Sequence, residues 1–484
     1  MAIYHLTATV ISRARGQRIV ASAAARSATT LYDEYYGITH NHSRKRGVTH
    51  VEIMAPAGSP AWVQDRALLW NRVEAAERRV DSQLARELEV GLPVELSQDQ
   101  SVALLRDFIT RQFLAEEMIA DFSVRRDNPN NPHAHILLTL RKATLSGFGP
   151  KVREWNRKTN LMDWRSAWAE RANQHLARAG HDARIDHRTL EAQQIELAPG
   201  PKIGIGGRRP TGQGLPKYLE ERIAEQKRTA KQNGDTILLD PTAALRALTR
   251  QQATFTHRDV ANFLRSRTDP AQYEAVLLAV MSSNELVALR PDGESEARFT
   301  SRDLLEAEKS LVRRAAVMAP RRGHGVAPQW QVSATSQHLL SEGHRGAFEY
   351  LVGDGDLKAL AVQAGNDKSA LLAVAREAWQ AQGFKVQGAA LSGLALKNLV
   401  TESGIESRTL ESYEQDWLQE QSPLTQNDVI VIDGSEMIGL KQLERVLAVA
   451  DKARAKVVLI GDSTQLAAMG ALSPLRDLIA KAGL

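Results

Sequence analysis

Two histidines, His133 and His135, are the residues whose types and spacing most directly suggest chemistry. They follow Asn131-Pro132 and open an apolar run that extends to Leu140, a pattern typical of a turn leading into a strand of a buried sheet. Residues two apart on a strand project from the same face. The two imidazoles can therefore share one metal ion, although an isolated His-x-His is more often a structural pair at a strand edge.

The segments that must position these histidines alternate irregularly between strands and helices. Apolar periodicity predicts strands over 2–11, 49–54, 87–93, 119–125 and 133–140. It predicts helices over 17–31, 60–79, 98–115 and 161–180. Because the pattern is no strict strand–helix–strand repeat, it favours an antiparallel sheet with helices on its faces, which is an α+β domain over residues 1–195.

The remainder of the chain divides into three further segments. Residues 196–253 combine a Gly-, Pro- and Arg-rich stretch with a charged helix, and we interpret them as a basic linker. Residues 254–325 are predicted to form a small helical module that includes a short extended piece at 285–289. From 326 to 484 strands and helices alternate, as in an α/β domain with a parallel sheet.

Composition sets broad limits on function. The 484 residues carry a net charge of +5, a mild tilt toward anionic partners such as nucleic acid. The absence of cysteine excludes disulfides, thiolate zinc sites and a cysteine nucleophile. No signal-peptide pattern and no apolar run of about 20 residues is visible. We therefore expect a cytoplasmic protein without a membrane segment.

Residues 1–195 also contain short motifs in a fixed order. They are AIYHLTATVISR, an alanine-rich segment ending in Arg26-Ser27, Arg44-Lys45-Arg46-Gly47-Val48, ELEVGLPVELS, Asn131 to Leu137, and Gly147-Phe148-Gly149. Together they resemble the MobA/MobL family of conjugative relaxases, HUH-type nucleases that nick plasmid DNA at a transfer origin. The resemblance implies a tyrosine that attacks a phosphodiester and a divalent cation, Mg²⁺ or Mn²⁺, held by three imidazoles. It implies single-stranded transfer-origin DNA and other conjugation proteins as partners.

Two positions depart from the family pattern. Its tyrosine stands before the Arg-Ser pair, where this chain has Ala25, which cannot attack phosphorus. Tyr32 is the candidate substitute, since seven residues along a helix keep it on the same face but about 10 Å away. The third metal ligand of the family falls on Arg125 or Arg126, and a guanidinium offers no lone pair. We expect a weakened metal site with His133 and His135 as its remaining ligands.

The last third carries a second set of motifs. They are Leu340 to Arg345, Val362 to Ser369, Gly388 to Gly393, Val429 to Met437 and Gly461 to Leu466. This set resembles the N-terminal motor domain of RecD-like superfamily-one helicases, which follows the relaxase in TraA-type members of the same family. The resemblance implies a P-loop NTPase-like (RecA-like) domain, and one that is incomplete because the sequence stops at Leu484.

The nucleotide site of that motor is degenerate in sequence. Its two P-loop glycine positions hold Val362 and Asp367, although glycines there let backbone N–H groups wrap the phosphates. Gly434 replaces the water-activating glutamate. The family residues that remain are Lys368, Ser369, Asp433 and Gln465. We therefore do not expect the chain to bind ATP.

These observations favour a relaxase-like protein that binds DNA but is impaired in nicking and ATPase activity. Clustered basic residues are the candidate phosphate contacts, namely Arg44, Lys45, Arg46, Arg125, Arg126, Arg208 and Arg209. One alternative is an active metal-dependent transesterase that uses Tyr32 or a neighbouring tyrosine. Another is an interaction scaffold that binds neither DNA nor metal.

Overall fold

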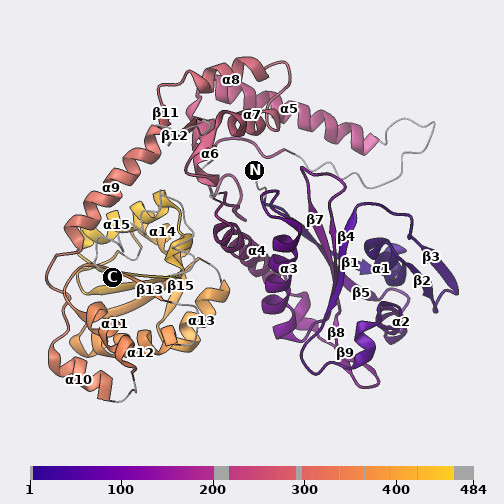
Figure 1. Ribbon diagram of the computed structural model, residues 1–484, viewed down its shortest axis with the longest axis horizontal. Helices are drawn as coiled ribbons and strands as arrows, with labels where there is room; N and C mark the ends of the chain where they lie inside the picture. Colours follow the sequence, from indigo (N-terminus) through magenta and orange to yellow (C-terminus); the bar gives the residue numbers. More distant parts are fainter. Residues whose placement is uncertain are drawn as a thin grey trace.

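The computed structural model describes residues 4–181, 183–193, 195–200, 217–289, 297–336, 338, 340–362, 367–391, 393–421 and 423–462. Figure 1 shows an N-terminal unit in indigo and purple and a C-terminal unit in orange and yellow, with a pink middle unit beside both. No helix of the described residues is long and apolar enough to cross a membrane.

The N-terminal unit is built on a five-stranded antiparallel sheet of order β1-β5-β7-β6-β4. Its strands are β1 (Leu6–Ser12), β4 (Val48–Met54), β5 (Gln83–Gly91), β6 (Ala120–Arg125) and β7 (His133–Leu138). Its helices are α1 (Ile19–Ser27), α2 (Arg66–Ala76), α3 (Gln98–Gln112) and α4 (Lys158–Arg178). The predicted antiparallel sheet with helices is confirmed, and β7 is its central strand.

Alternation along β7 gives the sheet two different faces. Ala134 and Ile136 turn toward α3 and α4 and join the larger hydrophobic core. Leu137 turns the other way and joins the core beneath α1 and α2. His133 and His135 have the same parity as Leu137, so both imidazoles lie on the face that carries α1.

Helix α1 is shorter than predicted. It ends at Ser27, where Ala28 adopts a left-handed φ of 54° and its N–H donates to the carbonyl of Ala24. The chain then turns into a hairpin of two strands, β2 (Thr30–Asp33) and β3 (Ile38–Asn41). The alanines let α1 approach the sheet closely, and Ala23 and Ala24 are fully buried.

Tyr32 therefore lies on a strand, and the prediction that it shares a helical face with Ala25 is wrong. Its neighbours Leu31 and Asp33 are buried, so alternation along β2 turns Tyr32 outward, where it is 54% exposed. Its hydroxyl lies over Gly37, in the turn of its own hairpin.

The middle unit combines helices with a small sheet. Helices are α5 (Lys217–Leu239), α6 (Thr242–Gln251), α7 (His257–Arg265), α8 (Tyr273–Met281) and α9 (Arg302–Met318). A small antiparallel sheet of order β10-β12-β11 accompanies them, made of β10 (Phe255–Thr256), β11 (Leu286–Leu289) and β12 (Arg298–Ser301). β11 falls on the extended piece predicted at 285–289, whereas β10 and β12 were not predicted, because strands of two to four residues are too short to show a period of two.

The C-terminal unit confirms the predicted parallel sheet. Within the described residues its strand order is β13-β17-β16-β14-β15. The strands are β13 (Leu357–Val362), β14 (Lys385–Ala390), β15 (Ser407–Thr409), β16 (Asp428–Asp433) and β17 (Lys456–Asp462). The helices are α10 (Pro328–Ser336), α11 (Glu342–Val352), α12 (Asp367–Gln382), α13 (Gly393–Ser403), α14 (Leu410–Leu418) and α15 (Leu440–Ala453). β16 is buried on both faces, as in sheets covered by helices on each side.

The C-terminal unit contacts both other units. Arg314 of α9 bonds to Glu444 and Asp451 of α15, at 3.4 and 3.2 Å. From the N-terminal unit, the carboxylate of Asp163 on α4 reaches the first turn of α13, where it lies 3.2 Å from the position that a Cβ on Gly393 would occupy. Figure 1 shows α4 on the side of the N-terminal unit that is turned toward α13.

Candidate nucleic-acid interface

The two histidines form an adjacent pair at the start of β7. Their ring centroids are 5.3 Å apart and the rings are nearly perpendicular. Nδ1 of His133 lies 3.0 Å from the carbonyl of Asn131, and Nδ1 of His135 lies 2.9 Å from Oε1 of Glu87 on β5. In both rings the Nδ1 atoms are engaged, so the Nε2 atoms are the positions open to a ligand.

Glu87 connects the histidine pair to α1. Its Oε1 also accepts a 2.5 Å hydrogen bond from Nε of Arg26, the residue after Ala25. Burial alone would raise the pKa of Glu87, but the bonds from His135 and Arg26 outweigh it and lower that pKa to about 2. Burial lowers the pKa of His135 more than its bond to Glu87 raises it. The carboxylate of Glu87 thus accepts a hydrogen bond from Nδ1–H of a neutral His135. The lone pair on Nε2 of that imidazole can then accept a hydrogen bond or bind a ligand.

Arg125 lies on the strand beside the histidine pair. In the register of β6 against β7, Arg125 is directly opposite His133, and Ser123 is opposite His135. The Arg125 side chain is 19% exposed, and one of its Nη2–H groups donates to Asp127 at 3.0 Å.

The donor set of this face does not fit the three-imidazole site that the family implies. Across the described residues, no group of three or more His, Cys, Asp or Glu side chains could hold a metal ion. The residues present offer two imidazoles beside a permanent cation, Arg125, which has no lone pair.

Three cations gather where α1 meets the sheet. Nζ of Lys45 donates to the backbone carbonyl of Ala25 at 2.5 Å. Burial lowers the pKa of Lys45, and the nearby charges of Arg125 and Arg26 lower it further. Because their charges affect the pKa of Lys45, the side chains of Arg26 and Arg125 lie close to it. We call Arg26, Lys45 and Arg125 the cationic cluster; it lies beside the histidine pair and the Ala25 position.

Gly47 brings the basic loop into this position. It adopts φ of +88°, and a Cβ there would come within 2.5 Å of the Cβ of Asp127, so only glycine fits. Its carbonyl accepts from the N–H of Arg126 at 2.9 Å. The loop that carries Lys45 is thereby joined to the end of β6, which carries Arg125.

The other predicted phosphate contacts are distributed differently. Arg44 and Arg46 are exposed on the same loop as Lys45. Arg126 points toward the opposite face, where its Nη2 donates to the Ser101 hydroxyl at 2.7 Å and to the carbonyl of Leu96 at 3.0 Å, beside the start of α3. It thus stabilises a helix start and is poorly placed for the cationic cluster. Arg208 and Arg209 lie outside the described residues.

At the predicted nucleotide site, two of the remaining family residues are bound to each other. Nζ of Lys368 lies 2.5 Å from Oδ1 of Asp433, so the lysine expected to meet a phosphate is neutralised by a carboxylate. The hydroxyl of Ser369 donates to Glu402. Gln465 lies outside the described residues. Whether the site binds ATP stays a prediction.

Sequence reasoning did not identify Arg26 and Glu87 as site residues. One signal was available, because Glu87 alternates with the apolar Leu88 on a strand whose neighbours are buried. A carboxylate at such a position requires a partner, and that partner is seldom visible in sequence.

Comparison with known proteins shows which families parts of the chain match. Residues 17–211 match the model of the MobA/MobL family, and residues 339–483 match the model of an AAA domain. The chain is 34% identical to the conjugal transfer protein TraA of Rhizobium radiobacter, over 100% of this chain and 48% of that protein. It is 35% identical to the mobilization protein MobL of Acidithiobacillus ferridurans, over 47% of this chain and 66% of that protein. The chain therefore spans about half the length of the TraA relatives.

One solved structure is also similar to part of the chain. It is titled "Molecular Basis of Vancomycin Resistance Transfer in Staphylococcus aureus" and is 33% identical, with a TM-score of 0.37. It corresponds to 39% of this chain and to 100% of its own.

Proposed function

Because residues 17–211 of this chain belong to the MobA/MobL family, we propose that it is a relaxase-like protein of conjugative transfer that binds single-stranded transfer-origin DNA and is impaired in nicking it. In this proposal the N-terminal sheet is an HUH-type domain and the C-terminal sheet is a RecA-like motor domain with a degenerate P-loop. Other conjugation proteins are its partners.

The cationic cluster is the observation that carries the proposal. Lys45, Arg26 and Arg125 meet on the helix-covered face of a central strand, beside two imidazoles with open Nε2 atoms. Guanidinium and ammonium groups donate strong charge-assisted hydrogen bonds to phosphate oxygens. Arg26 and Arg125 are paired with Glu87 and Asp127, and a bound phosphate would add a further anion that offsets the repulsion these cations exert on Lys45.

The proposed impairment of nicking rests on Ala25, Tyr32 and Arg125. Ala25 supplies no nucleophile, and Tyr32, the candidate substitute, lies on an outward-facing strand position rather than on α1. Arg125 replaces a neutral donor beside His133. A site that lacks both a placed nucleophile and a full donor set binds phosphate in the ground state without the interactions that a transition state requires.

A binding titration tests the proposal. We would measure the anisotropy of a labelled single-stranded oligonucleotide against the unaltered chain and against Lys45→Gln and Arg125→Gln. Each change should weaken binding about tenfold and reduce the salt slope by about one. Arg111→Gln is the matched control, since Arg111 is exposed on α3, on the other face of the sheet. Equal affinity of all four proteins would contradict the proposal.

A second assay tests impairment. The chain is incubated with labelled single strand and Mn²⁺, and covalent adducts are sought on a denaturing gel. The unaltered chain should form none, whereas Ala25→Tyr combined with Arg125→His should form one. An adduct with the unaltered chain that disappears in Tyr32→Phe would instead support the active transesterase. If the chain retains no DNA and Mn²⁺ leaves its thermal midpoint unchanged, the results would favour the interaction scaffold.

A further inference from the structure

The hairpin that follows α1 presents the most exposed tyrosines of the described residues. It consists of β2, β3 and the turn 34–37, and we call residues 30–41 the tyrosine hairpin. Three described aromatic side chains are at least 37% exposed, and two of them, Tyr32 and Tyr35 at 54% each, lie in this hairpin. Figure 1 shows β2 and β3 at the end of the N-terminal unit that is turned away from the C-terminal unit. Both rings are therefore open to a partner.

Arginines of the turn that precedes α1 support the rings at the tip of the hairpin. Cζ of Arg13 lies 4.4 Å from the ring centroid of Tyr35, and Cζ of Arg18 lies 4.2 Å from that of Tyr36. The two tyrosine rings meet edge to face at 4.8 Å. Arg13 is itself buried and is paired with Glu74 at 2.7 Å. A ring on a fixed support loses little conformational freedom when a ligand stacks on it.

The backbone of the hairpin is fixed as well. Asn71 of α2 donates from Nδ2 to the carbonyl of Tyr32 at 2.8 Å, and its Oδ1 accepts from the N–H of Glu34 at 2.9 Å. Within the turn, Oδ1 of the fully buried Asp33 accepts from the N–H of Tyr36 at 3.1 Å. These bonds hold the exposed rings in place before any partner arrives.

Polar side chains surround Tyr32 on the outward face of the hairpin. Thr39 lies opposite Tyr32 in the strand register, and Asn41 lies opposite Thr30. All four residues are exposed, and Tyr32 is the only aromatic one among them. A broad apolar patch would indicate a membrane or protein-docking surface. A ring among hydroxyl and amide groups instead suits a nucleobase, which stacks through its π-face and forms hydrogen bonds along its edges.

Positive charge is concentrated around the hairpin. The segment from Arg13 to Arg46 contains seven Arg or Lys residues and only two Asp or Glu residues. Arg15, Arg44 and Arg46 are exposed and form no ion pair with any described residue. Exposed rings beside unpaired cations are the combination by which proteins hold single strands, because the cations attract the phosphates while the bases stack on the rings.

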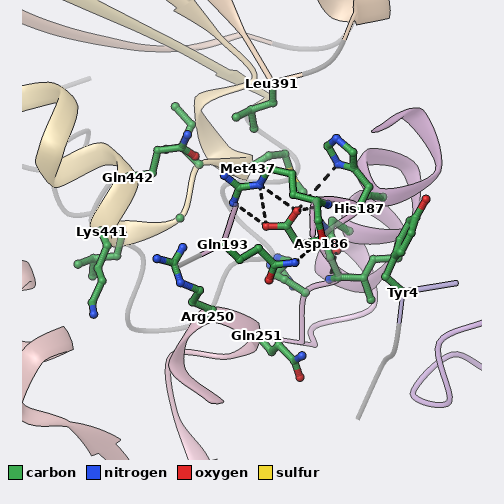
Figure 2. A pocket seen from close by; sticks show the side chains of 18 of the residues that line it. Tyr4, Asp186, His187, Gln193, Arg250, Gln251, Leu391, Met437, Lys441 and Gln442 are labelled. Carbon is green, nitrogen blue, oxygen red and sulfur yellow. Dashed lines mark hydrogen bonds and ion pairs between the residues drawn. The ribbon is translucent and has the colours of Figure 1, made fainter. Parts of the chain in front are cut away.

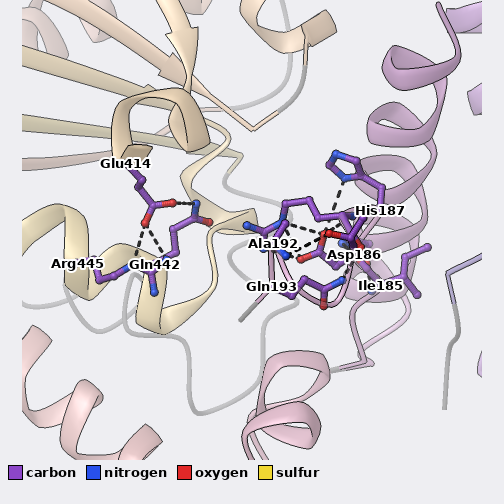
Figure 3. Close-up of polar contacts among 11 residues, drawn as sticks. Ile185, Asp186, His187, Ala192, Gln193, Glu414, Gln442 and Arg445 are labelled. Carbon is purple, nitrogen blue, oxygen red and sulfur yellow. Dashed lines mark hydrogen bonds and ion pairs between the residues drawn. The ribbon is translucent and has the colours of Figure 1, made fainter. Parts of the chain in front are cut away.

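Cations at the junction of the three units, such as Lys441 and Arg445, differ because they already have carboxylate partners. Figure 2 shows the cavity at this junction, with Lys441 on its wall. Lys441 is paired with Asp303, and Arg445 is paired with Glu414 at 2.7 Å (Figure 3). A phosphate that approached them would compete with those carboxylates. The exposed arginines beside the tyrosine hairpin meet no such competitor among the described residues.

The tyrosine hairpin also adjoins the cationic cluster. The N–H of His42, next to the end of β3, donates to the carbonyl of Thr29 at 3.1 Å, and the N–H of Lys45 donates to the carbonyl of His42 at 2.9 Å. Burial lowers the pKa of His42, and the nearby charge of Lys45 lowers it further. A strand with a phosphate at the cationic cluster would therefore have the hairpin beside it.

We propose that the tyrosine hairpin is a base-stacking surface, on which Tyr32 and Tyr35 receive bases of the single strand whose phosphates bind at the cationic cluster. The presence of that strand rests on the proposed function. The choice of nucleobases as the ligand rests on the exposed and fixed rings, the polar groups beside Tyr32 and the unpaired cations around the hairpin.

The first test removes the rings. The anisotropy of a labelled oligothymidylate is titrated with the full chain at several salt concentrations. Tyr32→Leu and Tyr35→Leu should each weaken binding about tenfold, with an unchanged salt slope because no charge is removed. Tyr35→Phe keeps the ring and should restore most of the affinity that Tyr35→Leu loses. Trp330→Leu is the matched control, since Trp330 is exposed on α10 of the C-terminal unit, and it should bind normally. Equal affinity of the unaltered chain and both leucine variants would overturn the proposal.

The second test removes the bases. A strand of abasic sites with the same length carries the same phosphates, and the unaltered chain should bind it more weakly than the oligothymidylate. Tyr35→Leu should weaken binding of the abasic strand no further, whereas Lys45→Gln should weaken binding of both strands alike. This comparison isolates the contact between ring and base. If Tyr35→Leu weakened binding of both strands equally, the ring would act through the fold of the hairpin, and the stacking proposal would be overturned.

The third test locates the bases on the chain. Irradiation with a 5-bromodeoxyuridine strand should crosslink the tryptic peptide 27–44, which contains all three tyrosines of the hairpin. Crosslinks confined to other peptides would overturn the base-stacking surface but leave the proposed function intact. If the unaltered chain retains no strand, the proposed function fails, and the base-stacking surface fails with it. Self-association of the chain that is lost in Tyr35→Leu would assign the hairpin to a second copy instead.

Discussion

Glu87→Gln is the most informative single change at the candidate interface. In the unaltered chain its carboxylate accepts from both His135 and Arg26, and its pKa falls from 4.5 to about 2. One pKa unit corresponds to about 1.4 kcal/mol, so the ionised carboxylate contributes about 3 kcal/mol to local stability. The side chain is 12% exposed, so solvent screens little of this.

The pH dependence follows from the direction of the shift. A carboxyl whose folded pKa is depressed contributes its stability above the unfolded pKa and loses it as pH falls through the folded value. The difference in stability between the unaltered chain and the Glu87→Gln variant should therefore be full above about pH 4.5 and should shrink toward zero near pH 2. His135 adds a second loss on acidification, since its lowered pKa means that the folded chain resists protonating it.

Peptide-level hydrogen exchange measures this locally, which is necessary because a chain of several units need not unfold in one step. Peptides of β5 and β7 should lose about 3 kcal/mol of protection in Glu87→Gln at pH 7, while peptides of β16 serve as the internal reference. Asp81→Asn is the control, because the Asp81–Arg79 pair is largely exposed. An equal difference at pH 7 and at pH 3 would refute the electrostatic account, and so would no difference at pH 7.

Three other changes test separate parts of the structure. Lys456 is fully buried in the C-terminal sheet, and burial is the chief reason that its pKa is lowered to about 7. In urea titrations at pH 7, Lys456→Met should raise the free energy of unfolding by about 1–4 kcal/mol. Only the unaltered chain should become more stable as the pH rises from 7 toward 10.5. Mg-ATP should leave the thermal midpoint unchanged, because Asp433 is paired with Lys368. For comparison, a ligand that binds the folded chain and is present at 100 times its Kd would add about 2.7 kcal/mol to the free energy of unfolding. Arg126→Ala should lower the protection of the first turn of α3 by about 1–3 kcal/mol, with DNA affinity nearly unchanged, as exchange and anisotropy would show.

The sequence predicts the sheet faces well because their cause is local. Alternation from His133 onward places both imidazoles on one side of β7 whatever surrounds them, and the structure confirms it. The end of α1 was less predictable. No glycine or proline marks it, and the left-handed turn falls on Ala28, so periodicity alone extended the helix beyond its true end.

Contacts distant in sequence set the remaining features. Only the register of β6 against β7 distinguishes Arg125, opposite His133, from Arg126, which serves α3. A cavity of about 460 Å³ between the N-terminal, middle and C-terminal units is lined by segments more than 200 residues apart, such as those of Asp186 and Arg445. No continuous stretch of the sequence shows which of these side chains become neighbours, although the sequence shows each charged residue singly.

In the proposed function, a guanidinium opposite His133 changes what the interface can do with a phosphate. Arg125 and Lys45 offer fixed N–H donors, which suit the geometry of a bound phosphodiester. Donors that bind the ground state and the transition state alike tighten binding without accelerating a reaction. Lys45 moreover donates to the carbonyl of Ala25, the residue at the position that the family resemblance assigns to the nucleophile. Under the proposed function, the residues at positions 25 and 125 would therefore favour retention of a strand over its cleavage.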